Sequence, residues 1–150
     1  MRFLDTTSLA TLTDTPQSKI RSAYVVDTSC VMAVALRESD HERYLALLTQ
    51  TGTLHLGAVS RVELGIVAQN RDVSTEVDAL LDALKVKIAT FDEKQSTMAI
   101  AAFAQYGKGR HPAALNFGDC CAYALAKALN LPLLYKGNDF AQTDIASALA

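Results

Sequence analysis

The sequence predicts an α/β fold, a three-layer α/β/α sandwich with a central parallel sheet. Short apolar segments without polar alternation, of which Tyr24-Val25-Val26 is the clearest, are typical of strands buried on both faces of such a sheet. Segments with helical periodicity separate these strands along the chain, as they do in βαβ units. At 150 residues the chain has the length of one compact domain.

The expected elements alternate in this way along the whole domain. After the first strand, we expect helices over 31–36 and 42–50, a strand at 53–56, helices over 60–70 and 74–84, a strand at 86–91, a helix from 93, a helix over 117–129 and a strand at 131–135. In the helix that starts near 93, Ala99, Ala102, Phe103 and Tyr106 are predicted to face inward. Residues 1–22 are rich in Thr and Ser and have little periodicity, so we expect them to be an extension outside a domain at 23–150; the alternative is a short segment docked on the domain or on a second subunit.

Composition argues against several classes of protein. No apolar run approaches the ~20 residues of a membrane span, and the N-terminus lacks the pattern of a secretory signal. Cys30, Cys120 and Cys121 have neither zinc-ligand spacing nor a disulfide pattern, which favours a reducing cytoplasm. The net charge is −2, with 16 acidic and 14 basic residues, so any binding of nucleic acid must depend on local patches.

Four acidic residues occupy equivalent places in this arrangement. Asp27 follows the first strand and Asp139 the last, whereas Glu63 and Asp119 are expected in the first turns of helices. Parallel topology brings strand ends and helix starts to one edge of the sheet. Carboxylates this close repel one another unless a divalent cation neutralises them, and an all-oxygen set favours Mg²⁺ or Mn²⁺ over zinc. The sequence therefore predicts a metal site that activates water to cut a phosphodiester.

Single members of this set also have a structural interpretation. Glu63 lies three residues after Ser60, and Asp119 lies three residues after Asn116, so either acid could belong to a helix cap. Asp27 is harder to explain in this way, because a carboxylate at the end of a buried strand needs a partner.

Four stretches around these acids resemble the motifs of PIN-domain proteins, specifically the VapC toxins of bacterial toxin–antitoxin pairs. The stretches are Val25-Val26-Asp27-Thr28-Ser29, Arg61-Val62-Glu63, Asn116-Phe117-Gly118-Asp119-Cys120 and Lys136-Gly137-Asn138-Asp139-Phe140. The resemblance covers roughly residues 23 to 145. It implies a Mg²⁺- or Mn²⁺-dependent endoribonuclease that forms a homodimer and is inhibited by a cognate antitoxin. By position, Asp27, Glu63 and Asp119 match the metal-binding acids of the family.

The fourth acidic position is open at this point. Asn138 and Asp139 both compete for it, and Asp144 is a more distant candidate. Beside Gly137 and Asn138, Asp139 could also be a simple turn residue. We predict that Asp139 is the fourth catalytic acid.

Basic and hydroxyl side chains near the acids are candidates for contacts with RNA or water. Lys108 and Arg110 lie in the most basic loop of the chain, and Lys136 follows the last strand, so all three could hold RNA phosphates. Thr28 or Ser29 could hydrogen-bond a carboxylate or a metal-bound water, or could cap a helix.

Two rival functions remain possible on the sequence alone. A non-catalytic PIN-fold module could use its acids to receive an arginine from a partner. A phosphoaspartate enzyme could use Asp27, although the second Asp that the haloacid-dehalogenase type needs two residues later is replaced by Ser29. The acidic pair that a receiver domain needs near the end of its first strand is also missing.

The apolar residues near the first helices predict a dimer. Val31, Met32, Leu36 and the Tyr44–Leu48 face exceed what one small domain needs to cover. We therefore expect part of this surface to form a two-fold interface.

Overall fold

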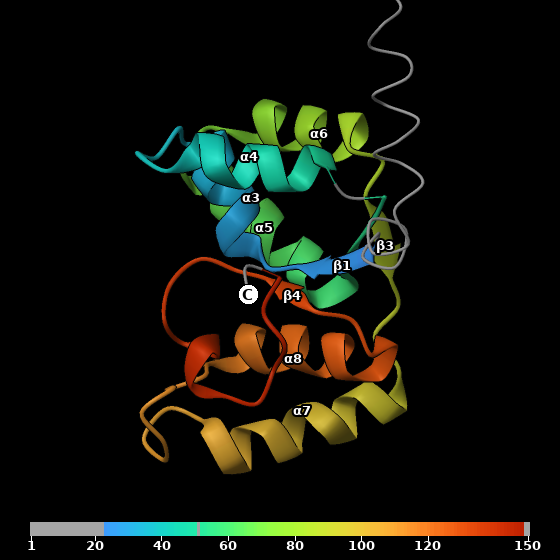
Figure 1. The fold of residues 1–150 in the computed structure, drawn as a ribbon, viewed down its shortest axis with the longest axis vertical. Helices are drawn as coiled ribbons and strands as arrows, with labels where there is room; N and C mark the ends of the chain where they lie inside the picture. The colour runs from blue at the N-terminus through green and yellow to red at the C-terminus, as the bar shows by residue number, and fades with distance from the viewer. Residues whose placement is uncertain (1–22, 51, 149–150) are drawn as a thin grey trace, which may run out of the picture.

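The computed structural model describes residues 23–50 and 52–148, and the extension expected over 1–22 lies outside them. The described residues form a sheet of four parallel strands in the order β3-β2-β1-β4 (Figure 1). The strands are β1 (Ala23–Val26), β2 (Thr53–Gly57), β3 (Lys87–Ala89) and β4 (Leu133–Leu134). The chain runs from β1 to β2 and β3 on one side and then crosses back to place β4 on the other side of β1. The strand order therefore reverses beside β1, and the carboxyl end of the strands at such a point is where these sheets place their sites.

Helices cover both faces of this sheet, as Figure 1 shows. On one face lie α3 (Thr28–Ala35), α4 (His41–Gln50), α5 (Ala58–Asn70) and α6 (Ser74–Ala83), and on the other lie α7 (Glu93–Tyr106) and α8 (Phe117–Leu129). A short 3₁₀ helix, η1 (Phe140–Gln142), follows β4. The predicted three-layer α/β/α sandwich with a parallel central sheet is therefore confirmed.

The two faces of the sheet belong to two apolar cores. Val25 and Leu133 point into the core shared with α7 and α8, whereas Val26 and Leu134 point into the core shared with α3 to α6. This alternation is the pleat of β1 and β4, and it explains why both strands are apolar at every position. Helix α8 is buried without interruption from Cys120 to Ala126, as its composition predicts. Within the described residues, no helix has the length and apolar character needed to cross a membrane.

Several boundaries differ from those predicted. Helix α3 begins at Thr28 because the Asp27 side chain already caps it, and α5 begins at Ala58 because the chain passes straight from β2 into the helix at Gly57. Strand β4 is shorter than predicted because its partner β1 ends at Val26, opposite Leu134.

The structure bears on two predictions about apolar residues. Phe103 is not a core residue; it is 38% exposed and lines a hollow between α7 and α8. The residues assigned to a dimer interface are mostly core residues: Val31, Met32, Tyr44 and Leu48 are buried where α3, α4 and α6 pack together. Burial within one chain therefore removes the basis on which that interface was predicted.

Candidate active site

Asp27 is the most buried of the four candidate acids, with 7% of its surface exposed. It follows β1 directly and is the N-cap of α3, where its Oδ2 accepts hydrogen bonds from the Ser29 backbone N–H (3.1 Å) and the Ser29 hydroxyl (2.6 Å). Burial raises the pKa of Asp27; its hydrogen bonds with Ser29 and Thr28 oppose that rise, and the charge of Asp139 adds to it. A carboxylate that ends a buried strand is thus held by neutral donors alone.

Glu63 reaches the same region from α5. Its Oε1 accepts a hydrogen bond of 3.2 Å from the Thr28 hydroxyl, on the first residue of α3. Burial raises the pKa of Glu63, and the nearby charge of Asp27 raises it further. The helix starts at Ala58, so Glu63 lies in the second turn; the predicted first-turn position and the cap with Ser60 are wrong. Its carboxylate is therefore not needed by the backbone of α5.

Asp119 has the capping role that the sequence suggested, and its charge is coupled to the other acids. With Asn116 it forms a capping box at the start of α8: the Asp119 N–H donates to Asn116 Oδ1 (2.8 Å), and the Asn116 N–H donates to Asp119 Oδ2 (3.0 Å). Burial raises the pKa of Asp119 to about 6, the Asn116 N–H opposes that rise, and Asp27, Asp139 and Glu63 add repulsion. The cap thus engages one carboxylate oxygen, and no hydrogen bond to the other is seen in the described residues.

Asp139 is the fourth acid that the structure brings to this cluster. It precedes η1, makes no side-chain cap there, and is exposed. Its charge nevertheless raises the pKa values of both Asp27 and Asp119, which requires proximity to each. The competing Asp144 is engaged elsewhere, since its carboxylate accepts from the Tyr123 hydroxyl (2.5 Å) and pairs with Lys127 (2.9 Å).

Asn138, the other competitor, is exposed, and its backbone carbonyl accepts a hydrogen bond of 3.4 Å from the Gln142 amide. No contact joins its side chain to the acids in the described part of the chain. Of the three candidates, Asp139 is therefore the one tied to the cluster by charge.

The four carboxylates form a cluster without a positive counterpart. In residues 23–50 and 52–148, no Lys, Arg or His makes an ion pair with Asp27, Glu63, Asp119 or Asp139. As their side chains stand, no three His, Cys, Asp or Glu residues of that part of the chain are disposed to share one metal ion. Each of three carboxylates is turned toward its own neutral donor, so the expectation of an already converged site is not met.

The donor chemistry nevertheless fits a hard divalent cation. The cluster offers oxygen ligands only, it is partly buried, and its carboxylates raise one another's pKa values. A bound Mg²⁺ or Mn²⁺ would relieve this repulsion, and a carboxylate that accepts hydrogen bonds on one oxygen can offer its second oxygen to a metal.

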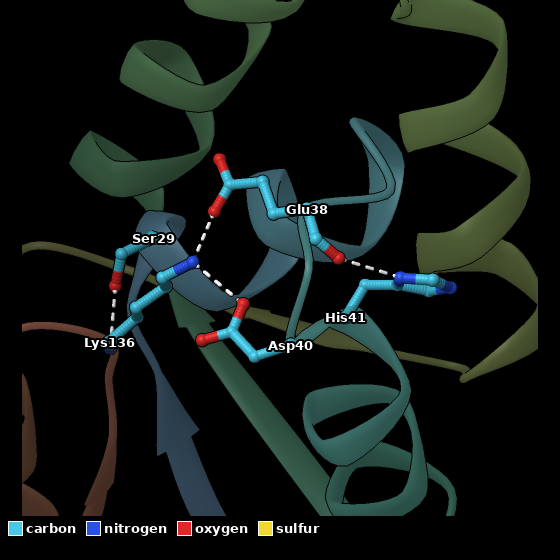
Figure 2. A network of polar contacts seen from close by, with 5 residues as sticks. All are labelled: Ser29, Glu38, Asp40, His41 and Lys136. Carbon is cyan, nitrogen blue, oxygen red and sulfur yellow. Dashed lines mark hydrogen bonds and ion pairs between the residues drawn. The ribbon is translucent and has the colours of Figure 1, made fainter.

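The predicted substrate-binding residues fall into two groups. Lys108 and Arg110 are exposed in the loop after α7, and the Arg110 guanidinium lies 5.4 Å from the centre of the Phe103 ring. The Lys136 ammonium instead lies between the carboxylates of Glu38 and Asp40, as Figure 2 shows. Only the first group has no carboxylate partner in the described residues.

Thr28 and Ser29, the two predicted hydroxyl residues, both lie against the acids. Thr28 donates to Glu63, and Ser29 donates to Asp27 while accepting the Lys136 backbone N–H at 3.0 Å. Both hydroxyls therefore orient carboxylates as the structure stands.

Gly118 is a site residue that the sequence did not reveal. A Cβ atom added at this position would lie 2.5 Å from Glu63 Oε2 and 3.0 Å from its carboxyl carbon. The absence of a side chain lets the Glu63 carboxylate lie against the first turn of α8, beside Asp119. Glu63 and Gly118 are far apart in the chain, so no local pattern could have indicated this contact.

Comparison with known proteins identifies the family of this chain. The PIN domain family model matches residues 24–146. Ribonuclease VapC28 of Mycobacterium tuberculosis and VapC ribonuclease Mb0625 of Mycobacterium bovis are each 41% identical to this chain over 129 residues, which is 83% of this chain and 97% of theirs.

Solved structures show the same fold at much lower identity. M. tuberculosis VapC20, described as a Sarcin-Ricin loop cleaving toxin, has a TM-score of 0.69 at 13% identity and covers 83% of this chain and 98% of its own. VapBC2 of Rickettsia felis, bound to a DNA fragment from its promoter, has a TM-score of 0.62 at 17% identity and covers 83% and 96%.

The raised pKa of Asp119 predicts a pH-dependent stability in the absence of divalent metal. The pKa in the folded chain, about 6, lies above the ordinary value of 3.8, so the folded state binds the proton more tightly than the unfolded state. This contribution is complete below about pH 4 and is lost as the pH rises through about 6. In EDTA, the melting temperature of Asp119→Asn should therefore fall less over this range than that of the wild type.

We expect a difference of about 2–4 °C, which corresponds to roughly 1 kcal/mol after solvent screening in a domain of this size. Asp82→Asn, which removes an exposed acid of α6, is the control and should follow the wild type. Parallel curves for Asp119→Asn and the wild type would contradict the electrostatic coupling of Asp119.

Proposed function

This chain belongs to the PIN-domain family, among the VapC ribonucleases, and we propose that it is a Mg²⁺- or Mn²⁺-dependent endoribonuclease toxin neutralised by a cognate antitoxin. One observation carries most of this proposal: Asp27, Glu63, Asp119 and Asp139 are coupled by charge at the end of β1, and none has an ion-pair partner in the described residues. Such a cluster is costly to fold unless it binds a cation.

The acids divide the work according to their burial. Asp27, Asp119 and Glu63 would hold the metal, which when bound supplies charge stabilisation at the phosphate and lowers the pKa of a water molecule. Thr28 and Ser29 keep two of these carboxylates in fixed orientations. Asp139 is exposed at the rim and free of a cap, so its carboxylate is suited to orient the attacking water.

RNA would approach over the basic loop after α7. Lys108 and Arg110 are exposed there, and their charges are not neutralised by carboxylates of the described residues. Phosphate contacts of this kind would hold the RNA over the acids, and they do not depend on the nucleotide sequence of the RNA. A local basic patch thus offsets a net charge of −2.

The antitoxin would cover the apolar surface beside the acids. A hollow between α5 and α8 is lined by Val62, Ile66 and Phe117 and reaches Glu63. Phe117 is 75% exposed, which is unusual for so large an apolar side chain. An apolar segment in this hollow could place an arginine among the carboxylates, where its fork can bridge two of them.

We also propose that the protein is a homodimer in the cytoplasm, as its resemblance to the VapC toxins implies.

A non-catalytic module of the same fold is the second candidate. It is favoured by one observation, that no three acids of the described chain are disposed to share a metal as they stand. In that case a partner's arginine, and no metal ion, would be the missing positive charge.

RNA cleavage with defined metals separates these two candidates. The purified protein should cut total RNA in Mg²⁺ or Mn²⁺ and should be inactive in EDTA. Asp119→Asn should lower the rate by about 100-fold or more, because it removes a charged ligand but keeps the acceptor that caps α8. If the protein cuts RNA with neither metal, the non-catalytic module is supported. Cleavage in EDTA would instead indicate a contaminating ribonuclease.

Gly118→Ala should separate the position of Glu63 from the stability of the fold. The new methyl group would displace the Glu63 carboxylate, and since this is the end of a flexible side chain, the cost in stability should be small. We expect RNA cleavage to fall by about 10-fold or more. Alanine in a helix should itself contribute up to about 1 kcal/mol of stability.

Gly65→Ala is the matched control for this variant. Gly65 is also helical, in α5, and an added Cβ would approach only the end of the Arg61 side chain, at 3.3 Å. This variant should keep wild-type activity. Equal activity in Gly118→Ala and Gly65→Ala would exclude a need for the Glu63 position.

The antitoxin and the metal should compete for the acids. Antitoxin affinity, measured at increasing Mn²⁺ and fixed ionic strength, should fall as Mn²⁺ rises for the wild type and much less for Asp119→Asn, in which the metal site is weakened. If Mn²⁺ leaves the affinity of the wild type unchanged, the antitoxin inhibits by covering the apolar hollow and not by an arginine.

A further inference from the structure

We propose that Lys136 is a positioning residue, which holds the Asp27 carboxylate through Ser29. The side chain of Lys136 is itself held by Glu38 and Asp40, and we call these three residues the lysine lock. The inference rests on the proposed function in one respect, that Asp27 is a ligand of the catalytic metal.

The backbone of Lys136 orients the hydroxyl group on Asp27. The Ser29 hydroxyl has one proton, which it donates to Asp27 Oδ2 at 2.6 Å. Its oxygen accepts the Lys136 backbone N–H at 3.0 Å. Both ends of the hydroxyl are thus engaged, and its rotation is fixed as long as the chain at Lys136 stays in place.

The side chain of Lys136 keeps that piece of chain in place. Its ammonium bonds to Glu38 Oε1 and, at 2.7 Å, to Asp40 Oδ1, and the two acids lie in the loop between α3 and α4 (Figure 2). This loop is anchored in turn: the Glu38 N–H donates to the Ala33 carbonyl at 3.0 Å, and the Glu38 carbonyl lies 2.7 Å from the His41 ring. The lysine lock therefore ties the end of β4 to the loop after α3, the helix that Asp27 caps.

The charges in the lysine lock argue against a phosphate-binding role for Lys136. Two carboxylates around one ammonium leave a net negative group, which repels phosphate. The hydrogen bonds to Asp40 and Glu38 raise the pKa of Lys136, and the same contact lowers the pKa of Asp40. The ammonium is thus already satisfied within the chain, unlike the side chain of Lys108.

The lysine lock also precedes the turn that carries the fourth acid. Gly137 follows with a φ of +101°, a conformation that favours glycine, and Asp139 comes two residues later. Fixing Lys136 thus fixes the start of this turn. Two of the four acids, Asp27 and Asp139, therefore depend on the same anchor.

The test compares two ways of breaking the lysine lock. Lys136→Met removes the ammonium, whereas the double variant Glu38→Gln with Asp40→Asn keeps the ammonium but removes its partners. Both should weaken Mn²⁺ binding and lower kcat for RNA by about 10-fold or more, as loss of a group that orients a metal ligand does. KM and the salt dependence of RNA binding in EDTA should change little. Lys136→Arg should restore most of the loss, because a guanidinium can bridge two carboxylates.

Two lysines of the chain supply controls. Lys127 makes a similarly exposed ion pair with Asp144, away from the acids, and Lys127→Met should leave Mn²⁺ affinity and kcat unchanged. Lys108→Met should instead raise KM and reduce the salt dependence of RNA binding.

A phosphate-binding role gives the opposite results. Removing Glu38 and Asp40 would then free the ammonium, so the double variant would bind RNA more tightly and with a steeper salt dependence, while Lys136→Met would raise KM and leave Mn²⁺ affinity unchanged. Either result would overturn the positioning role.

A failure of the proposed function can be distinguished from a failure of the lysine lock. If the wild type cuts no RNA, hydrogen exchange of the Lys136 backbone amide in EDTA still reports on the lysine lock. This exchange should be several-fold faster in the double variant than in Lys127→Met. Equal exchange in these two variants would reject the lysine lock, whatever the activity of the protein.

Discussion

The buried carboxylate of Asp27 is the constraint on which the rest of the site depends. β1 carries it into the centre of the sheet, where its only described hydrogen-bond donors are the neutral groups of the first turn of α3. A buried charge without a counterion costs folding free energy. Two hydrogen bonds from Ser29 to one carboxylate oxygen offset part of this cost. The same arrangement keeps the carboxylate available for a cation. The same side chain thus caps a helix and, in the proposed function, holds the metal.

The carboxylates of Asp119 and Glu63 are held in place by other contacts. Asp119 completes a capping box with Asn116, so its stabilising role at the start of α8 keeps the carboxylate in place whether or not a cation is bound. Glu63 has no such role in α5 and depends on a hydroxyl from Thr28 and on the space left by Gly118. The position of Glu63 is therefore the most easily disturbed of the three.

Sequence reasoning succeeded where the signal is local. The apolar run before Asp27 and the spacing of Asn116 and Asp119 predicted a strand end and a helix cap, because both depend on neighbours within a few residues. It placed Glu63 in the wrong turn because α5 begins after Gly57, which makes no side-chain cap and so leaves no signal in the sequence.

Long-range contacts account for the remaining differences. The apolar residues of α3 and α4 were assigned to a dimer surface, but the packing of α6 against α3 buries them, and nothing local to α3 indicates a helix that comes some forty residues later. Lys136 meets Glu38 from a distance of 98 residues along the chain. A lysine in a turn between a strand and an acid looks like a phosphate ligand until these partners are known.

The direction of the Lys136 side chain decides whether its positive charge can pair with the four acids. Its backbone N–H lies beside Ser29, so an ammonium turned the other way would have had the opportunity to pair with the acids themselves. Such an ion pair would satisfy Asp27 and would exclude a divalent cation, since both compete for the same oxygens. Glu38 and Asp40 draw the ammonium away toward the α3–α4 loop. The backbone of Lys136 can therefore position Ser29 while its ammonium stays away from the acids. The four acids remain without an ion-pair partner in the described structure.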